Sequence, residues 1–371
     1  MRLPPFKLEQ FFARHEFTVP HLLCASDVQA LTLNALVALA DDESKALWDG
    51  LGLGYSEAFG HPLLRSRLAA DYAGLEPEHI LVANPQELIF LFMHAALQPG
   101  DHAIVAWPAY QSLHEVARAI GAEVSLLPLD PAADFALDVD ALRALVRPNT
   151  KLIVVNTPHN PSGSLLDEAT LRSVAGVADE AGAYFFCDEV YRFLEHDPSQ
   201  RLPPAATLSD RAVSFSALSK AYGLAGLRVG WVATRDTALL RRMQQLKDFT
   251  SICHSAPSEI LACMALSARA VLVERALGIV RHNLGLYAAF FARHREVFEW
   301  LRPRAGSTSL VRYRPGHSEA FSDALVAESG VLLMPASVFD LPGDYLRIGL
   351  GRDGTAAGLQ ALDDHLLRHP S

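Results

Sequence analysis

Lys220 is the side chain of this sequence best placed for covalent chemistry with a carbonyl group. The chain has only five lysines against 27 arginines, so a lysine placed between an apolar run and a glycine-rich stretch is unlikely to serve solubility alone. Lysine forms Schiff bases with carbonyl compounds, whereas the delocalised guanidinium of arginine does not. Arg228, which follows in the same stretch, suits bidentate binding of a phosphate or carboxylate. The two residues together predict a Schiff-base lysine beside an anion site.

Two further segments place polar side chains after apolar runs. Asn160 lies in the segment Asn156–Gly163, where two prolines and a glycine predict a rigid loop; an ordinary strand-to-helix turn is the alternative. Asp188 ends the apolar run that begins at Phe185. A carboxylate in such a place is partly desolvated and requires a cationic partner, unless it serves only as a helix cap or in a salt bridge.

Short apolar runs alternate with amphipathic stretches through the middle of the chain, and these elements must position the three segments. The expected strands are Ile80–Ala83, His102–Ala106, Lys151–Asn156, Ala183–Asp188, Arg211–Ser216 and Arg228–Ala233. The alternation predicts an α/β fold with a doubly wound, mostly parallel sheet that is buried on both faces. Ligands of such sheets bind beyond the carboxyl ends of the strands, which is where the three segments fall.

The two ends of the chain differ from this middle part. Residues 1–50 are expected to form an N-terminal arm and part of a small domain, residues 51–265 the large domain, and residues 266–371 a C-terminal α+β domain. A long helix is predicted from Ser258 past Val280. Further strands are predicted at Ser309–Arg314, Val331–Met334 and Tyr345–Leu350.

Composition excludes several classes of protein. The 371 residues are 50% hydrophobic and 20% charged, which is typical of a globular chain, and the net charge of −10 does not favour nucleic acid or an anionic membrane as a partner. The longest apolar run, Leu88–Leu97, is too short to span a membrane, and no signal peptide is visible, so a cytoplasmic location is expected. The four cysteines show no metal-site or disulfide spacing.

The motifs Asn160–Gly163, Asp188–Tyr191 and Ser219–Arg228, in this order, resemble those of the fold-type I pyridoxal-phosphate enzymes of aminotransferase class I/II. The resemblance covers nearly the whole chain and implies that the cofactor is pyridoxal 5'-phosphate. It also implies that Lys220 carries the cofactor as a Schiff base and then moves protons as general base and acid. Asp188 would pair with the pyridinium nitrogen, so that the ring accepts electrons.

The resemblance implies further contacts with the cofactor. Asn160 and Tyr191 would bind the phenolic oxygen, Arg228 and Ser219 the phosphate, and Tyr110 would stack on the ring.

Two more roles follow from the resemblance, one at an interface and one at the substrate. Tyr55 would reach the phosphate of a second subunit, because members of the family are usually homodimers. Arg347 would bind the substrate α-carboxylate, with Asn160 beside it. Amino acids and keto acids are the implied substrates.

The sequence departs from the family pattern at the phosphate site. The family usually has a glycine and a small residue where this chain has Asn84 and Pro85. Pro85 lacks an N–H group, so the following amides, at Gln86 and Glu87, would have to bind the phosphate. Ala217 stands where the family has a hydroxyl. A working site with altered phosphate contacts is expected.

The resemblance favours an aminotransferase, with a lyase or cyclase as the alternative reaction. The cofactor motifs are also similar to those of capreomycidine synthases, members of the family that eliminate water from a hydroxy-arginine and cyclise it. A nicotinamide-dependent dehydrogenase is disfavoured because the glycines of Gly50–Gly54 do not lie between a strand and a helix, and a ligand-sensing regulator is disfavoured because no DNA-binding segment precedes them. Arg192, His254 and Arg312 are polar candidates for recognition of the substrate side chain.

Overall fold

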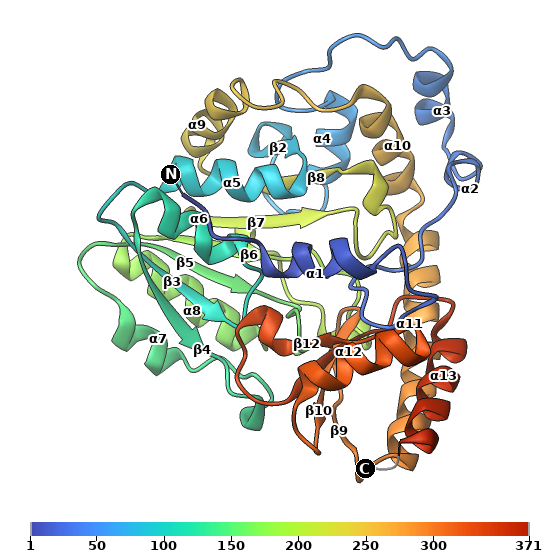
Figure 1. The fold of residues 1–371 in the computed structure, drawn as a ribbon. Coiled ribbons are helices and arrows are strands. Elements are labelled where there is room, and N and C mark those ends of the chain that lie inside the picture. Colours follow the sequence, from blue (N-terminus) through green and yellow to red (C-terminus); the bar gives the residue numbers. More distant parts are fainter. Residues whose placement is uncertain (1, 370–371) are drawn as a thin grey trace.

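A seven-stranded sheet forms the centre of the larger part of the molecule (Figure 1). The computed structural model describes residues 2–369. The strands lie in the order β2-β8-β7-β6-β5-β3-β4, and only β8 runs antiparallel to its neighbours. Their bounds are β2 (Ile80–Ala83), β3 (His102–Trp107), β4 (Glu123–Pro128), β5 (Thr150–Asn156), β6 (Tyr184–Asp188), β7 (Ala212–Ala217) and β8 (Gly230–Ala233).

Helices cover both faces of this sheet. Apolar side chains of α5 (Pro85–Ala96), α6 (Ser112–Ile120) and α9 (Thr237–Lys247) pack on one face. Those of α7 (Val139–Leu145) and α8 (Glu168–Ala181) pack on the other. Strands β2, β7 and β8 are accordingly buried along their whole length, and β5 and β6 along most of theirs, as the continuous apolar runs predict. The structure confirms the predicted α/β fold with a doubly wound, mostly parallel sheet.

A smaller antiparallel sheet, in the order β12-β13-β10-β9, forms the C-terminal part of the chain. A two-stranded parallel pair, β1 with β11, lies beside it and joins the two ends of the chain. The strands are β1 (His21–Leu22), β9 (Phe298–Leu301), β10 (Thr308–Tyr313), β11 (Val331–Leu332), β12 (Met334–Pro335) and β13 (Tyr345–Gly349). The helices of this part are α11 (Arg269–Arg293), α12 (Ser318–Ser329) and α13 (Thr355–Arg368). No helix among residues 2–369 has both the length and the apolar character needed to cross a membrane.

Two predicted elements are each divided in the structure. The helix expected from Ser258 past Val280 consists of α10 (Ala256–Ser267) and α11, with Ala268 between them at φ −92° and ψ 14°. Alanine is a strong helix former, so the local sequence does not signal this break. The strand expected at Val331–Met334 is likewise two short strands that belong to different sheets.

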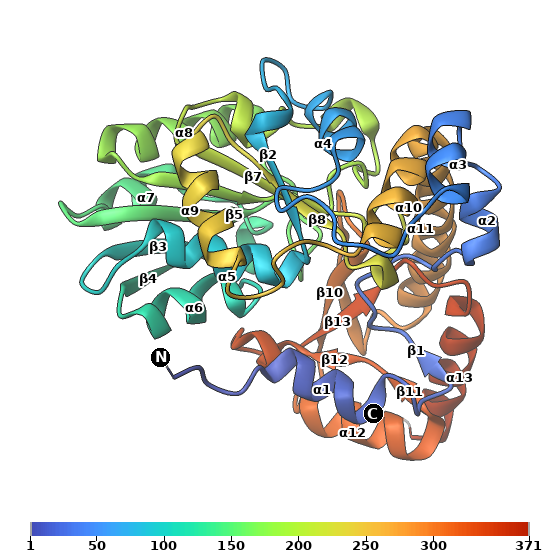
Figure 2. The same ribbon diagram turned by 90° about the horizontal axis from the view of Figure 1, so that it is seen from above.

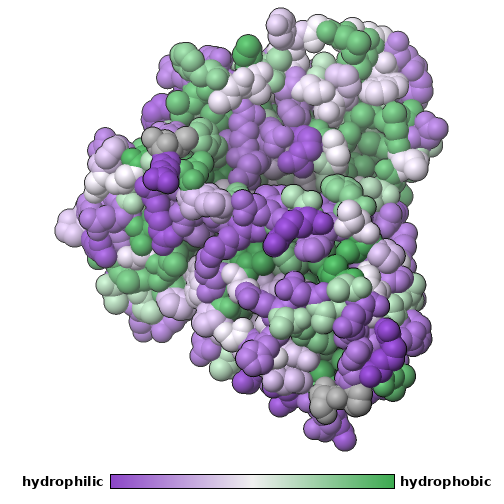
Figure 3. All heavy atoms as spheres, viewed as in Figure 1, coloured by the Kyte–Doolittle hydropathy of each residue, from purple (hydrophilic) through white to green (hydrophobic). Residues whose placement is uncertain are grey.

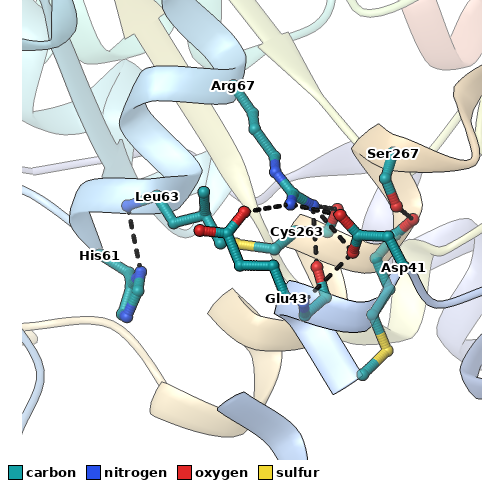
Figure 4. Close-up of polar contacts among 9 residues, drawn as sticks. Asp41, Glu43, His61, Leu63, Arg67, Cys263 and Ser267 are labelled. Atoms are coloured by element: carbon teal, nitrogen blue, oxygen red, sulfur yellow. Dashed lines mark hydrogen bonds and ion pairs between the residues drawn. The ribbon is translucent and has the colours of Figure 1, made fainter. Parts of the chain in front are cut away.

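Arg67 ties the N-terminal helices to α10 (Figure 4). Its guanidinium forms ion pairs with Asp41 at 2.6 Å and Glu43 at 2.9 Å. It also donates to Ser44 Oγ at 2.8 Å and to the Cys263 carbonyl at 2.7 Å. The α-helices between β1 and β2 are α2 (Leu33–Val37), α3 (Asp42–Asp49) and α4 (Pro62–Ala69). One half-buried guanidinium therefore holds α4, the start of α3 and α10 together.

Helix α1 (Lys7–His15) contacts both parts of the molecule, as Figures 1 and 2 show. Lys7 forms an ion pair with Asp340 of the C-terminal part. On the other side, Glu9 accepts a hydrogen bond of 2.8 Å from the Tyr110 hydroxyl, in the loop after β3. The buried face of α1 packs on apolar residues that follow α12. The helix therefore lies across the region between the two sheets.

Candidate active site

A cavity of about 580 Å³ opens at the carboxyl ends of β5, β6 and β7. The last residues of β5 and β6, Asn156 and Asp188, are register partners, so the loops after these strands begin side by side. Helix α1 and residues 25–27 form the opposite wall. The cavity is where a ligand of an open α/β sheet is expected. Of the residues named from the sequence, those that line it are Gln86, Tyr110, Asn160, Asp188, Tyr191, Ser219, Lys220 and Arg228.

The Lys220 amine lies at the wall of the cavity, in the turn that follows β7. Its Nζ donates a hydrogen bond of 2.8 Å to Ser26 Oγ. The amine also lies 5.7 Å from the centre of the Tyr191 ring. Among the described residues no carboxylate pairs with Lys220, so the amine is held by a neutral hydroxyl beside open space.

Asp188 is a buried carboxyl group without a cationic hydrogen-bond partner among residues 2–369. Its Oδ1 accepts a 3.2 Å hydrogen bond from the Val190 N–H. Burial raises the pKa of Asp188 to about 7, against the lowering effects of that N–H and of Lys220. A cationic ring nitrogen in the cavity would stabilise the charged form of this carboxyl, and the site therefore fits a pyridinium group.

Asn156 links the loop that carries Asn160 to the end of the strand that carries Asp188. Its Oδ1 accepts a 2.7 Å hydrogen bond from the Asn160 N–H, and its Nδ2 donates to the Asp188 carbonyl at 2.9 Å. His159 adds a second link, because its Nε2 donates to the Pro108 carbonyl at 2.8 Å. Burial lowers the pKa of His159 to about 4, so the ring is neutral near pH 7. These positioning roles were not predicted from the sequence, although a strand that ends in asparagine is a detectable signal.

Arg347 is completely buried next to the cavity. Its guanidinium donates to the Cys24 carbonyl at 2.8 and 3.2 Å and to Asn160 Oδ1 at 3.3 Å. The rings of Phe12 and Phe339 lie 5.7 and 5.3 Å from it. Burial lowers the pKa of this guanidinium, and no carboxylate among the described residues forms an ion pair with it. A buried cation with only neutral partners fits an anionic ligand group.

Donors for a second anion meet at the other end of the cavity. The Gln86 N–H and Arg228 Nη2 both point to Asn84 Oδ1, at 3.2 and 3.4 Å. Asn84 caps α5, whose first residue is Pro85, so Gln86 supplies the first N–H of the helix. The N-terminus of α5, where these donors meet, is a favourable place for an anion such as phosphate.

Besides Arg347, which reaches the cavity through Asn160, two of the proposed site residues do not line the cavity. The Glu87 carboxylate instead accepts hydrogen bonds from Thr250 Oγ1 and, at 3.3 Å, from the Ser251 N–H. Tyr55 is 92% exposed on the surface. The polar candidates for side-chain recognition are also outside the lining; these are Arg192, His254 and Arg312.

The wall that the N-terminal segment contributes to the cavity was not predicted from the sequence. Its lining residues are Phe6, Leu8, Glu9, Phe12, Glu16, Ala25, Ser26 and Asp27. The 3.6-residue periodicity of residues 7–15 could have predicted the helix, but it could not have predicted what the helix packs against.

Comparison with known proteins agrees with this geometry. Residues 22–366 match the family model "Aminotransferase class I and II". The chain is 33% identical to capreomycidine synthase of Streptomyces vinaceus, over 99% of this chain and 95% of that protein. It is 30% identical to an arginine–pyruvate transaminase of Pseudomonas aeruginosa, over 80% and 77% of the two chains.

A solved structure is similar over the whole length. It is a PLP-dependent aminotransferase from Streptococcus suis, 31% identical, with a TM-score of 0.92 and 100% coverage of both chains. These matches confirm the resemblance seen in the motifs, the fold and the cofactor, pyridoxal 5'-phosphate. The chain belongs to the aminotransferase class I and II family of pyridoxal-phosphate-dependent enzymes.

Proposed function

We propose that this enzyme transfers an amino group between an amino acid and a keto acid. The observation that carries the proposal is the placement of three groups at one cavity: the Lys220 amine, the unpaired carboxyl of Asp188 and, through Asn160, the buried guanidinium of Arg347. Pyridoxal phosphate supplies an aldehyde that condenses with amines and a ring that accepts electrons when a bond to Cα breaks.

Residues around Lys220 would hold the ring of the cofactor. Asp188 would bind the pyridine nitrogen and keep it protonated, in agreement with its burial and its lack of a cationic partner. Asn160 and Tyr191 would bind the phenolic oxygen, and Tyr110 would lie against the ring. The hydrogen bond from Tyr110 to Glu9 fixes the orientation of that aromatic side chain.

Residues at the start of α5 would hold the phosphate together with Ser219 and Arg228. The donors that now converge on the Asn84 oxygen, from Gln86 and Arg228, support this placement. The N–H of Glu87 would add a further donor, although its carboxylate is bound elsewhere.

The remaining charged side chains, those of Arg347 and Lys220, indicate which groups of the substrate they would bind or react with. Arg347 would bind the α-carboxylate of the amino acid or keto acid, because bidentate binding of a carboxylate suits a guanidinium. The Nζ atom of Lys220 would take a proton from Cα of the donor in one half-reaction and give a proton to Cα of the acceptor in the other.

A homodimer is part of the proposal. Tyr55 lies outside its own cavity and is exposed, as are other large apolar side chains of the same region: Leu53, Phe249 and Ile252. Ser56 Oγ donates to the His254 carbonyl at 2.9 Å, which joins the two loops that carry these residues. Figure 3 shows hydrophobic surface along the upper edge of the molecule, near the loop between α3 and α4. A second copy would cover this surface and receive Tyr55 at its phosphate site.

We further propose the domain boundaries and the cellular location expected from the sequence. Residues 51–265 would form the large domain, and residues 1–50 with 266–371 the small one, which agrees with the β1–β11 pairing and the break at Ala268. The four free cysteines are compatible with a reducing, cytoplasmic environment.

The visible absorption spectrum tests the proposed function. Addition of particular amino acids without keto acid should bleach the cofactor band, with one keto acid formed per site, and a keto acid should restore it. Lys220→Ala should lower turnover by about 10⁴-fold or more, whereas the exposed Lys45→Ala control should retain it. Unchanged turnover in Lys220→Ala would contradict the proposal.

Elimination with cyclisation is the second candidate reaction, and the 33% identity to capreomycidine synthase favours it. The same experiment separates the two reactions. An eliminating enzyme would act on an amino acid with a leaving group at Cβ and release a modified product, while the cofactor band returns without any keto acid.

A further inference from the structure

The wall of the cavity that the N-terminal segment forms carries acids and no base. Glu9, Glu16 and Asp27 line the cavity on this side. The two bases of the lining, Lys220 and Arg228, come from the segment after β7, and the Lys220 amine meets the N-terminal wall at the neutral hydroxyl of Ser26. A ligand that extends from Lys220 towards α1 therefore meets negative charge.

Only one of these three acids lacks a partner among the described residues. Both oxygens of Asp27 pair with Arg352 Nη2, at 2.8 and 3.0 Å. Glu9 accepts the hydrogen bond from Tyr110. The half-buried Glu16 has no hydrogen bond or ion pair for its carboxylate within residues 2–369.

The surroundings of Glu16 do not neutralise its charge. Burial and the nearby carboxylates of Asp27 and Glu9 raise the pKa of Glu16, and this outweighs the lowering effect of Arg352 and Lys220. A cation placed beside this carboxylate would relieve both the desolvation and the repulsion.

The face of α1 that lines the cavity also has an apolar part. Leu8, Phe12 and Glu16 are spaced by four residues, so they lie on one face of the helix and its C-terminal end. The Phe12 ring lies 5.7 Å from the guanidinium carbon of Arg347, the proposed carboxylate site. A side chain leaving that site would first meet an aromatic ring and then a carboxylate.

We propose that Glu16 selects amino acids whose side chain has an apolar stem and a cationic end, such as arginine, lysine or ornithine. The inference rests on the proposed function, since it requires the amino acid to bind between Lys220 and α1. The stem would pack on Phe12, and the guanidinium or ammonium group would donate to the Glu16 carboxylate. Acidic side chains would be repelled by Glu16 and Glu9.

Citrulline provides the test, because it has nearly the shape of arginine but a neutral end. In the holoenzyme, kcat/KM for arginine should exceed that for citrulline, and Glu16→Gln should reduce this ratio by about tenfold or more. A role of Glu16 in folding alone would lower both values equally and leave the ratio unchanged. Glu319→Gln, an exposed acid on α12, serves as the matched control and should leave both values unchanged.

The outcomes separate this inference from the proposed function. If the enzyme transfers amino groups but does not prefer arginine to citrulline, the inference is overturned and transamination is retained. The same holds if it prefers arginine and Glu16→Gln leaves that preference unchanged. If no amino group is transferred, titration of the cofactor band still reports binding. The inference would then be supported if arginine binds more tightly than citrulline and Glu16→Gln abolishes this difference. Equal binding of the two amino acids, or no change in the cofactor band, would overturn it.

Discussion

Asp188 and Arg347 are two buried charged groups near one cavity that do not neutralise each other. Within residues 2–369, the Asp188 carboxyl accepts a hydrogen bond only from a backbone N–H, and the Arg347 guanidinium donates only to a carbonyl and an amide oxygen. Burial of a charge without a partner is unfavourable, so each group costs stability when no ligand is present. Pyridoxal phosphate and the substrate carboxylate bring the opposite charges.

The unfavourable burial of Asp188 predicts a pH effect on the apoprotein. Its pKa is raised from 3.8 to about 7, so the folded state binds the proton more tightly than the unfolded state. The stability that this group contributes is therefore present below about pH 4 and is lost as the pH rises to 7. From pH 5 to pH 8 the loss is about 3 kcal/mol.

Asp188→Asn should remove this dependence. Without cofactor, urea unfolding at pH 8 should show the variant more stable than wild type, and the difference should shrink towards pH 5. The Asp210→Asn control changes an acid that is 88% exposed and should follow wild type. If the free energy of unfolding depended on pH equally in Asp188→Asn and in wild type, the pKa of the Asp188 carboxyl would not be raised.

At the scale of elements, the loop Asn156–Gly163 is held by contact with the C-terminal part. Gly163 has φ +73°, and its carbonyl accepts hydrogen bonds from the Arg304 N–H at 2.8 Å and the Ala305 N–H at 3.0 Å. A Cβ atom at Gly163 would lie 2.5 Å from the Thr308 carbonyl oxygen, and backbone cannot yield as a flexible side chain can. The loop that carries Asn160 therefore depends on this glycine.

Gly163→Ala should destabilise the protein by about 3 kcal/mol or more, because strain at positive φ adds to the clash. Its activity should fall as well, since displacement of the loop moves Asn160 away from Arg347. Thermal unfolding and steady-state kinetics measure the two effects.

Gly176→Ala on α8 is the matched control. Apart from the helix's own backbone and the residues next to Gly176, no heavy atom of residues 2–369 lies within 4 Å of a Cβ at that position, so the change should stabilise the helix by about 0.5–1 kcal/mol and leave activity intact. If both alanine variants behaved alike, contact at Gly163 would not position the loop.

The sequence predicted the elements that have strong local signals. The apolar runs that became β5, β6 and β7 were identified because both faces of these strands are buried, and the turn after β7 was marked by its lysine and glycines. The edge strand β4 was missed because most of its residues are partly or fully exposed and break the apolar run. The position of α1 over the cavity depends on contacts between distant parts of the chain, which no local pattern encodes.

The site residues also differ in how far the sequence alone could identify them. Lys220 and Asp188 stand out because their residue types are unusual for their positions. Arg347 was named from its motif, but its lack of a carboxylate partner could be found only in the folded chain. Glu16 has no motif at all, and only its place on the cavity wall draws attention to it.

At the scale of the whole molecule, the exposed position of Tyr55 predicts that each active site needs two chains. Lys220→Ala should be inactive, and Tyr55→Ala should bind cofactor weakly because it lacks a phosphate donor. Mixing the two variants under conditions that allow subunit exchange should restore activity, since one site of each hybrid contains both native residues. At complete exchange, activity should reach about a quarter of wild type, because half of the dimers are hybrids with one intact site.

Light scattering of the same samples gives the assembly state. Restored activity in a dimer supports the shared site. A monomeric enzyme with full activity, or no recovery on mixing at any ratio, would contradict it.

The pairing of β1 with β11 has a consequence for how the enzyme is made. A ribosome releases α1 and β1 before the large sheet, but their partners, β11 and the residues near Asp340, emerge only after that sheet. The large sheet with Lys220 and Asp188 lies entirely between these events. The strands of the large sheet can therefore pair on the nascent chain before α1 and β1 meet their partners. The acidic wall, Arg347 and the backbone contacts at Gly163 that hold the Asn160 loop are added afterwards, so the cavity is completed by segments that lie on both sides of the large sheet in the sequence.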